Sequence, residues 1–413
     1  MKRIIYIIYL LFVSLLASWL IPNAVQFLTY SYDRYPMIHF SSINKTFMFY
    51  QKNDKGQSVY QDENGNKYTE KEYYALHPML YYRQLTMDGS LPDTIAGMPV
   101  SPEQLSKQTF TFRYKPEEKN HPSIPLYPMY ESASGLVNLS EPTDMFRLKN
   151  KMEFIKSSNN KRDEGKSELF TAALSKVGFT FPAQWTAGLP FAKKPFDDGY
   201  FSLDKTGKLY QIKMVKGRPQ VADTHASKKF AVRHMLPIST KDHALLGFVV
   251  SWKNELYALY NQDFKLRKIL SNFDPNNDKL SIFGSPLYWT IWIDNEQGRT
   301  AFAWDARTYE EVSSYHIPPK KKLWNTLRQW LFPFRTEINH NNTAYIFPVI
   351  ADPSGKALIL NFMLAAGFWV VAKRQKRKKS FTCFSSMLFI LAFGLFGLIA
   401  TITASNETSL DHT

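Results

Sequence analysis

Three long apolar segments restrict how this chain can fold. They are residues 4–21 (IIYIIYLLFVSLLASWLI), residues 357–372 (ALILNFMLAAGFWVVA) and residues 381–404 (FTCFSSMLFILAFGLFGLIATITA). A helix of about 20 apolar residues is long enough to cross the hydrocarbon core of a membrane. The sequence therefore predicts three transmembrane helices at these positions, with a large extramembrane domain between the first and the second.

The first apolar segment has two interpretations. Lys2 and Arg3 precede it, which is typical of a membrane anchor with a cytoplasmic N-terminus and also of a signal peptide. A signal peptide needs small residues at its cleavage site, but Trp19, Leu20 and Ile21 stand where they are expected. We therefore expect residues 4–21 to be an uncleaved anchor.

A run of positive charge lies between the second and third apolar segments. Its members are Lys373, Arg374, Lys376, Arg377, Lys378 and Lys379. Short basic loops remain in the cytoplasm, so this run predicts a cytoplasmic loop at residues 373–380. Residues 1–3 then lie in the cytoplasm, whereas a domain at residues 31–354 and a tail at residues 405–413 lie outside. The expected localisation is a bacterial inner membrane, with the main domain in the periplasm and membrane lipid as a partner.

The net charge of +15 raises the question of nucleic-acid binding. Much of this charge flanks the apolar segments, where it orients them in the membrane, so we expect no nucleic-acid partner. The chain has one cysteine, Cys383, which excludes an intrachain disulfide and any metal site built from several cysteines.

Residues 31–354 show a repeated pattern of strands and polar turns. Similar units start at Gly199, Leu245 and Leu287, and a fourth similar stretch starts at Met37. Each unit alternates apolar and polar residues around turns that suit β-hairpins. The later units follow one another at roughly 45 residues, the length of a propeller blade. The sequence thus predicts a mainly β fold with helical insertions, propeller-like, with a β-meander or an irregular α+β domain as alternatives.

Helices are expected as insertions in this domain and after it. Thr69 begins a capping box that predicts a helix through Leu85, and Ser101 begins a second, shorter one. A third helix is expected at residues 166–179. Residues 320–332 (KKKLWNTLRQWLF) gather Leu and Trp on one helical face, which favours an interfacial helix on the membrane over one that docks on the domain.

The sequence carries no motif of a known catalytic or metal site. No histidine pair has the spacing of a zinc motif, and no G-x-S-x-G or Walker sequence is present. Asp197 and Asp198 are adjacent on an extended segment, so their side chains point to opposite faces and do not converge as the carboxylates of a glycosidase do. Trp292 and other tryptophans suit sugar stacking or a sheet core. We therefore predict no catalytic residue, no metal and no cofactor.

Several long stretches resemble one family of bacterial envelope proteins. They are LHPMLYYRQLTMDGSLPDTIAG, IPLYPMYESASGLVNLSEPTDMFRL, KSELFTAALSKVGFTFPAQWTAG and KPFDDGYFSLDKTGKLYQIKMVKG. Through them the chain is similar to a Bacteroidota family of unknown function, domain-of-unknown-function family 4857, over roughly residues 30 to 400. The resemblance implies no activity. It implies ABC-transporter genes as neighbours, and hence an accessory role beside an ABC ATPase and a permease.

If the family's motif positions form one surface, the residues expected to bind there are Tyr82, Arg83, Asp93, Glu131, Arg147 and Asp198. The alternative is that these residues hold the domain together through buried hydrogen bonds and ion pairs. The sequence therefore predicts a non-enzymatic inner-membrane protein with a periplasmic β domain, acting as an accessory subunit of an ABC-transporter-type complex. The alternative function is a membrane-anchored periplasmic glycan-binding module or hydrolase.

Overall fold

The computed structural model describes residues 2–29, 35–53, 55–120, 124–136, 139–319, 323–339, 347–374 and 381–410. The chain divides into a β unit at Tyr35–Pro319 and a helical unit that combines Met1–Arg34 with Lys320–Thr413. The β unit ends earlier than residue 354, the boundary expected from the sequence. The reason is that the helix and hairpin after Pro319 belong to the helical unit.

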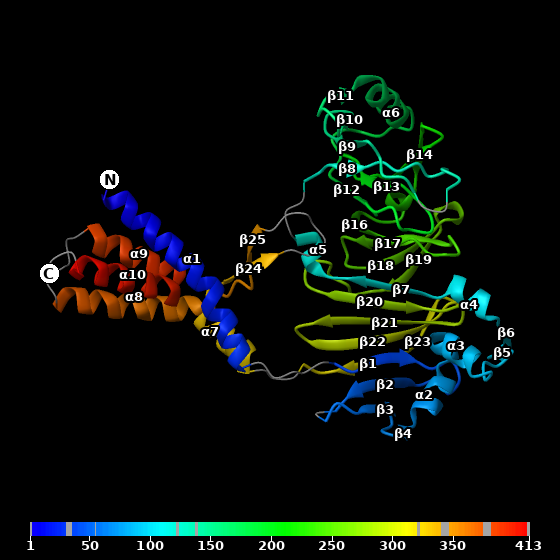
Figure 1. The fold of residues 1–413 in the computed structure, drawn as a ribbon, viewed down its shortest axis with the longest axis horizontal. Helices are drawn as coiled ribbons and strands as arrows, with labels where there is room; N and C mark the ends of the chain where they lie inside the picture. The colour runs from blue at the N-terminus through cyan, green and yellow to red at the C-terminus, as the bar shows by residue number, and fades with distance from the viewer. Residues whose placement is uncertain are drawn as a thin grey trace. The chain divides into compact units, whose positions relative to one another are not determined.

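The β unit is a succession of small antiparallel sheets, which we number in chain order (Figure 1). The first sheet contains β1 (Met37–Phe40), β2 (Phe47–Lys52), β3 (Ser58–Asp62) and β4 (Lys67–Tyr68). The second contains β8 (Tyr127–Pro128), β9 (Asp144–Leu148), β10 (Met152–Lys156) and β11 (Arg162–Asp163). The third contains β12 (Trp185–Gly188), β13 (Tyr200–Leu203), β14 (Leu209–Val215) and β15 (Arg218–Asp223).

The remaining sheets lie toward the C-terminal end of the unit. The fourth contains β16 (Val232–Pro237), β17 (Leu245–Ser251), β18 (Leu256–Tyr260) and β19 (Leu266–Leu270). The fifth contains β20 (Lys279–Gly284), β21 (Tyr288–Asn295), β22 (Gly298–Asp305), β23 (Glu310–Ile317) and, from earlier in the chain, β7 (Phe110–Tyr114). A separate short hairpin pairs β5 (Thr94–Ile95) with β6 (Met98–Pro99).

The polar turns between the strands form as the sequence predicts. The buried carboxylate of Asp204 accepts hydrogen bonds from the backbone N–H groups of Thr206 and Lys208 at 2.8 and 2.9 Å. Asp62 accepts from the backbone of its own turn in the same way. Each carboxylate thereby satisfies donors that the tight turn leaves without a strand partner. The prediction of a mainly β fold built from such repeats is confirmed.

Apolar side chains between the sheets hold the β unit together. Buried clusters join the second sheet to the third, the third to the fourth, the fourth to the fifth, and the fifth to the first. Phe248 and Ile291, both fully buried between the fourth and fifth sheets, each contribute roughly 1.5–3 kcal/mol. Among the described residues no such cluster joins the first sheet to the second. The sheets are blade-like, but they do not close into the ring of a propeller.

The insertion after the first sheet begins with the predicted capping box. Thr69 caps α2 (Glu70–Leu76), and its own backbone N–H donates to the Glu72 carboxylate at 2.7 Å. The helix predicted through Leu85 is interrupted, because Pro78 lacks an N–H and forces the residue before it out of the helical conformation. A separate helix, α3 (Pro78–Met87), therefore starts there. The insertion continues with α4 (Pro102–Gln108), predicted from Ser101, and with α5 (Pro116–Asn120).

Strand β7 leaves this insertion and pairs with β20 at the edge of the fifth sheet. The aromatic ring of Phe110 lies directly over Gly284, where a Cβ atom would stand 2.1 Å from Phe110 Cε1. Only glycine fits at that position. The close approach anchors β7 and brings the residues that follow Phe110 beside β20. Near the second sheet, α6 (Glu164–Lys176) forms where residues 166–179 predicted a helix, and Phe170 packs on Phe154.

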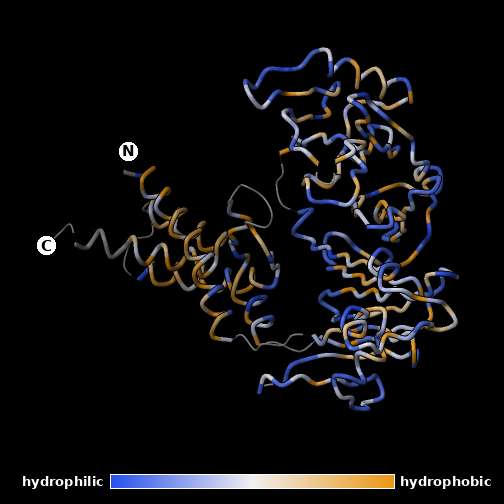
Figure 2. The backbone as a smooth tube through the Cα atoms, turned by 45° about the vertical axis from the view of Figure 1, so that its right-hand side comes forward, coloured by the Kyte–Doolittle hydropathy of each residue, from blue (hydrophilic) through white to orange (hydrophobic). Residues whose placement is uncertain are grey.

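The helical unit holds two helices that are long and apolar enough to cross a membrane, counted over the described residues. They are α1 (Lys2–Thr29) and α8 (Ala357–Arg374). Figure 2 shows apolar residues through most of the helical unit. Large apolar side chains remain exposed on both, including Ile4 (64%), Phe12 (66%) and Phe362 (65%). Exposed apolar surface of this extent is typical of a helix that faces lipid.

The prediction of a third transmembrane helix at residues 381–404 is wrong. Two shorter helices stand there, α9 (Phe381–Phe393) and α10 (Leu395–Leu410), separated by Gly394 in the left-handed conformation (φ +58°). Asn361 of α8 packs against this break, and its Nδ2 donates to the Leu391 carbonyl at 3.0 Å. Hydropathy detects the apolar content of the segment, but it cannot detect a change of direction at one glycine.

The chain reverses between α9 and α10. Along α1, Tyr6 lies 2.8 Å from Ser386 of α9 (Oη to Oγ), whereas Ala17 packs with Phe396 at the start of α10. Farther along α10, Ala400 and Ala404 pack with Leu10, closer to the start of α1. The two helices therefore form a hairpin beside α1. The expectation that residues 405–413 lie outside the cytoplasm depended on a third transmembrane helix. Because α9 and α10 form a hairpin instead, this expectation no longer has support.

Two further predictions concern the edges of this unit. Lys373 and Arg374 form the exposed last turn of α8, whereas Lys376, Arg377, Lys378 and Lys379 lie outside the described residues.

The predicted helix at 320–332 is α7 (Leu323–Leu331), followed by β24 (Arg335–Asn339) and β25 (Phe347–Ala351). Trp324 of α7 is buried against Phe332 and Phe396, while Leu323 and Trp330 are exposed. One side of α7 thus docks within the helical unit.

Candidate functional site

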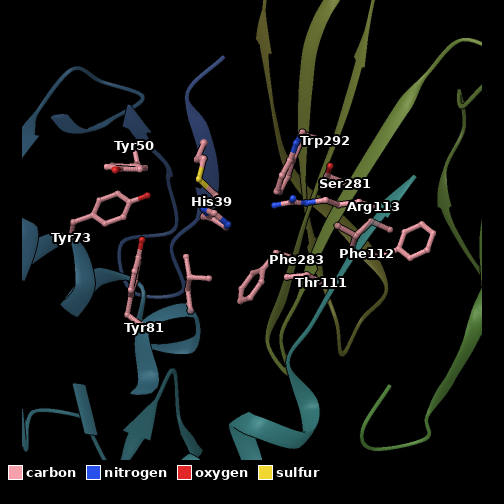
Figure 3. A pocket seen from close by; sticks show the side chains of 13 residues that line it. His39, Tyr50, Tyr73, Tyr81, Thr111, Phe112, Arg113, Ser281, Phe283 and Trp292 are labelled. Carbon is pink, nitrogen blue, oxygen red and sulfur yellow. The ribbon is translucent and has the colours of Figure 1, made fainter. Parts of the chain in front are cut away.

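A cavity of about 170 Å³ lies between the first and fifth sheets of the β unit. Figure 3 shows its side chains converging from β1, β2 and the α2–α3 segment on one side and from β7, β20 and β21 on the other. The close approach of β7 to Gly284 places the residues after Phe110 in this wall. The cavity is therefore a product of the packing between sheets, and no single sheet forms it alone.

Five aromatic side chains line the cavity. They are Tyr50, Tyr73, Tyr81, Phe283 and Trp292, whereas the ring of Phe112 packs on Phe248 of the fourth sheet. His39 lies among them, with its ring edge-on to Phe283 at 5.5 Å and to Trp292 at 5.8 Å between centroids. Such edge-to-face packing keeps aromatic rings in fixed orientations. The wall is thus largely apolar and positioned by neighbouring rings, which is typical of small-molecule sites.

Two polar atoms in this wall are buried without a hydrogen-bond partner among the described residues. They are Nδ1 of His39, a residue that is 5% exposed, and the hydroxyl of Tyr73, a residue with no exposed surface. Figure 3 shows the Tyr73 hydroxyl directed toward His39 and the interior of the cavity. Leaving such a group unsatisfied costs about 1–3 kcal/mol. Both atoms are inaccessible to solvent, so a bound molecule reaches them only where the surrounding side chains shift.

The histidines beside the cavity are uncharged at neutral pH. Burial, and to a smaller extent nearby His77, lowers the pKa of His39 to about 3. Burial also lowers the pKa of His77 to about 4, against the opposing effect of its hydrogen bond with the Tyr73 carbonyl. His77 Nδ1 lies 3.0 Å from that carbonyl oxygen and Nε2 lies 3.5 Å from the His39 carbonyl oxygen, so the shorter contact favours the proton on Nδ1. A histidine with a pKa near 3 is a poor general base at pH 7.

The tyrosines keep their protons as well. Burial, with a smaller contribution from Tyr60, raises the pKa of Tyr81 to about 12, and burial also raises the pKa of Tyr73. Their hydroxyl groups therefore act as hydrogen-bond donors at neutral pH. Arg113, Thr111 and Ser281 add polar groups to the side of the cavity formed by β7 and β20. The lining residues, all of them described, include no carboxylate.

Residues outside the cavity wall fix the position of Trp292. The Arg299 guanidinium lies 5.8 Å from the centre of the Trp292 ring, and Arg299 is itself held by the Asp294 carboxylate through bonds of 2.5 and 2.7 Å. A cation on an aromatic face contributes about 0.5–1 kcal/mol at an exposed site. Trp292 is therefore positioned before any ligand arrives.

The residues predicted from the sequence as a binding surface are distributed over the β unit. Tyr82 and Arg83 lie on α3, where Arg83 Nε donates to the Tyr82 hydroxyl at 3.1 Å, and Asp93 is exposed in the loop that follows. Tyr82 is buried in the cluster between the first and fifth sheets. Arg147 on β9 pairs with Glu153 at 2.7 Å. Tyr82 and Arg83 contact each other, whereas Arg147 pairs with a residue of the second sheet, and a common binding role for the predicted residues stays a prediction.

Glu131 fastens the segment after β8 to the β14–β15 turn. Its carboxylate accepts hydrogen bonds from the backbone N–H groups of Lys216 (2.7 Å) and Gly217 (2.9 Å), and from that of Ala133 (3.1 Å). Burial raises the pKa of Glu131, but these three donors together outweigh burial and lower it. The carboxylate therefore acts as a structural link in its charged form.

Asp198 and its neighbour Asp197 have different partners, as their adjacent positions predict. Asp198 Oδ1 lies 2.8 Å from His243 Nε2. Asp197 forms a buried ion pair with Lys194 at 2.6 Å and accepts a hydrogen bond from Ser132 at 2.6 Å. The two carboxylates therefore do not share a site in which a glycosidic bond could lie between them.

Sequence reasoning missed most of the cavity. The sequence predicts sugar stacking or sheet-core packing for Trp292, and it predicts only a helix for the segment with Tyr73 and Tyr81. His39 carries one local signal, since it is a polar residue inside the apolar strand β1 (MIHF). Nothing in the sequence shows that β7 and β20 supply the opposite wall.

Comparison with known proteins supports the family resemblance. Residues 37–304 match the family model of a domain of unknown function, DUF4857. A search of curated proteins finds no match. The β-propeller domain of Cps50 (Swd1) from Myceliophteria thermophila aligns over 71% of this chain and 90% of that one, at 8% identity and a TM-score of 0.22. PorZ, a surface component of the type-IX secretion system of Porphyromonas gingivalis, aligns over 70% of this chain and 33% of that one, at 10% identity and a TM-score of 0.18. Similarity at this level carries no functional argument.

Proposed function

Because the chain belongs to DUF4857, a family described as a domain of unknown function, we propose a function from its site and its helices: it is a membrane-anchored binding protein. The β unit binds a small molecule in the aromatic cavity, and the helical unit anchors the protein in the membrane. The observation that carries the proposal is the pair of buried, unpartnered polar atoms of His39 and Tyr73 in an aromatic wall. A ligand that bonds to these two atoms would satisfy them.

The charge distribution of the helical unit supports the anchoring and its orientation. Arg3, at the start of α1, lies 5.1 Å from the ring centre of Phe381, which begins α9. Lys373 and Arg374 end α8. In the chain, the β unit follows the opposite end of α1, and its C-terminal end leads through α7, β24 and β25 to the opposite end of α8. By the positive-inside rule, the basic ends lie in the cytoplasm and the β unit lies in the periplasm of a bacterial cell. The packing of Leu10 with Ala400 and Ala404 supports a retained, uncleaved α1.

A ligand screen tests the binding function. The full-length protein in detergent is screened against a library of small molecules by ligand-observed NMR, beside two variants. Ser281→Trp fills the cavity, whereas Ser314→Trp adds the same side chain on the exposed surface of β23. Compounds are expected to bind the wild type and Ser314→Trp but not Ser281→Trp. A library in which no compound shows this difference contradicts the proposal.

The accessory role beside an ABC ATPase and a permease remains a proposal supported by the sequence resemblance alone. A gentle-detergent pulldown of the tagged protein from its native membranes tests it, with partners read by mass spectrometry. Recovery of both subunits in near-equal amounts is the expected result, and recovery of the protein alone contradicts it. The alternative of a glycan hydrolase is not favoured, since the described lining residues contain no pair of carboxylates.

A further inference from the structure

We infer that the cavity between the first and fifth sheets binds a monocyclic carboxylate, a single six-membered ring that carries one carboxylate group. This inference rests on the proposed binding function and names the chemical class of its ligand. It is drawn from the volume of the cavity, the composition of its wall and the charges around it.

The volume of the cavity favours a ligand with a single ring. The cavity measures about 170 Å³, and an apolar cavity of about 150 Å³ is known to hold one benzene molecule. A ring with one small substituent fills this space, whereas a disaccharide or a nucleotide exceeds it. The aromatic wall favours a flat ring, because rings pack edge-to-face or offset against Phe283 and Trp292.

The hydroxyl groups of the cavity can each donate a hydrogen bond, and Arg113 can only donate, so the lining suits an acceptor on the ligand. The Tyr73 hydroxyl keeps its proton and has no partner among the described residues. Thr111 and Ser281 supply further hydroxyl groups. A carboxylate offers two oxygens and accepts several such bonds at once. His39 Nδ1 can donate or accept, according to its tautomer.

One cation in the cavity lining determines which charge the ligand carries. The exposed Arg113 side chain lines the cavity, and it forms no hydrogen bond or ion pair with the described part of the chain. In Figure 3 its guanidinium extends from β7 toward the His39 side of the cavity. Both neighbouring histidines are neutral, so Arg113 is the charged group that the lining residues contribute. An aromatic wall alone would suit an ammonium ion, but Arg113 repels a cation and pairs with a carboxylate.

Three probes that share a benzene ring but differ in charge separate the effect of ligand charge on affinity from that of ligand shape. Benzoate, benzyl alcohol and benzylamine are titrated into the full-length protein in detergent, and binding is measured by calorimetry. Benzoate is expected to bind tightest and benzylamine weakest. Arg113→Gln is expected to weaken benzoate about tenfold, the usual effect of losing one charge-assisted hydrogen bond, and to leave benzyl alcohol unchanged. Arg218→Gln, which removes an exposed arginine from β15, is the matched control and should change neither affinity.

The outcomes distinguish this inference from the proposed function. Equal affinity for benzoate and benzylamine, or a benzoate affinity that Arg113→Gln leaves unchanged, overturns the carboxylate assignment. If Ser281→Trp still abolishes the binding of benzyl alcohol, the cavity remains a binding site for another class of ligand. If none of the three probes binds, the ring-carboxylate inference is refuted, and the library screen against Ser281→Trp decides the binding function separately.

Discussion

Removing the hydroxyl group of Tyr73 should make the free protein more stable. This hydroxyl is fully buried and has no hydrogen-bond partner among the described residues, whereas the ring packs against Tyr60 and His77 at 4.8 and 4.5 Å between centroids. Tyr73→Phe keeps the ring and deletes only the unsatisfied group. Most substitutions in a core destabilise, so a gain in stability would mark a residue kept for binding rather than for folding.

The magnitude follows from the cost of a buried polar group. An unpartnered hydroxyl costs about 1–3 kcal/mol, and deleting it should return about 1–2 kcal/mol to the free energy of unfolding. Tyr114 provides the matched control, because its buried hydroxyl donates to the Pro275 carbonyl at 2.6 Å. Tyr114→Phe leaves that carbonyl without its donor and should lower the free energy of unfolding by about 1–2 kcal/mol.

Chemical denaturation of the full-length protein in detergent measures both effects, with far-UV circular dichroism to follow the β unit. Tyr73→Phe should raise the denaturant midpoint, and Tyr114→Phe should lower it. The same Tyr73→Phe protein should bind benzoate more weakly than the wild type does. The reasoning is refuted if Tyr73→Phe destabilises as much as Tyr114→Phe, since the hydroxyl would then have a partner in the free protein.

Three further substitutions test other parts of the structure. Lys194→Met leaves the buried Asp197 carboxylate without its cation and should cost about 3–5 kcal/mol in urea denaturation, much of which Lys194→Met/Asp197→Leu should restore; equal losses in both would contradict the pairing. Because the pKa of Glu131 is lowered on folding, its stabilisation is present above the ordinary value of 4.5 and is lost as the pH falls through the folded value. The midpoint difference between wild type and Glu131→Gln should therefore shrink on acidification, and a constant difference would contradict it. Gly394→Ala forces alanine to φ +58° and should destabilise the full-length protein in detergent by about 1–2 kcal/mol, whereas Gly367→Ala, with open space around it, should not; equal heat resistance of the two variants would argue against the α9–α10 turn.

The repeats of the β unit could be predicted because each sheet is mostly local in sequence. Units that start at Gly199, Leu245 and Leu287 alternate in hydropathy and meet at short polar turns, so strand and turn signals lie side by side. The same reasoning recognised the capping box at Thr69. It could not assign β7 to the fifth sheet, because that pairing joins residues far apart in the chain.

The cavity and the α9–α10 hairpin depend on such distant contacts. His39 is a polar residue in an apolar strand, but nothing local shows that it lines a cavity until β7 and β20 are placed opposite it. Residues 381–404 have the composition of a single transmembrane helix, and the break depends on the backbone angle of one glycine that packs against Asn361. Local patterns predict elements, whereas these features arise from how the elements meet.

The side of the membrane on which the β unit lies is the most direct test of a membrane-anchored binding protein. Single cysteines are introduced at Lys107, exposed on α4, and at Arg374, exposed at the end of α8, in a Cys383→Ser background. Spheroplasts are treated with a membrane-impermeant maleimide before and after lysis. The cysteine at position 107 should label in intact spheroplasts, and the one at position 374 only after lysis. Labelling of position 374 in intact spheroplasts, or recovery of the protein in the soluble fraction, would contradict the anchored, periplasmic arrangement.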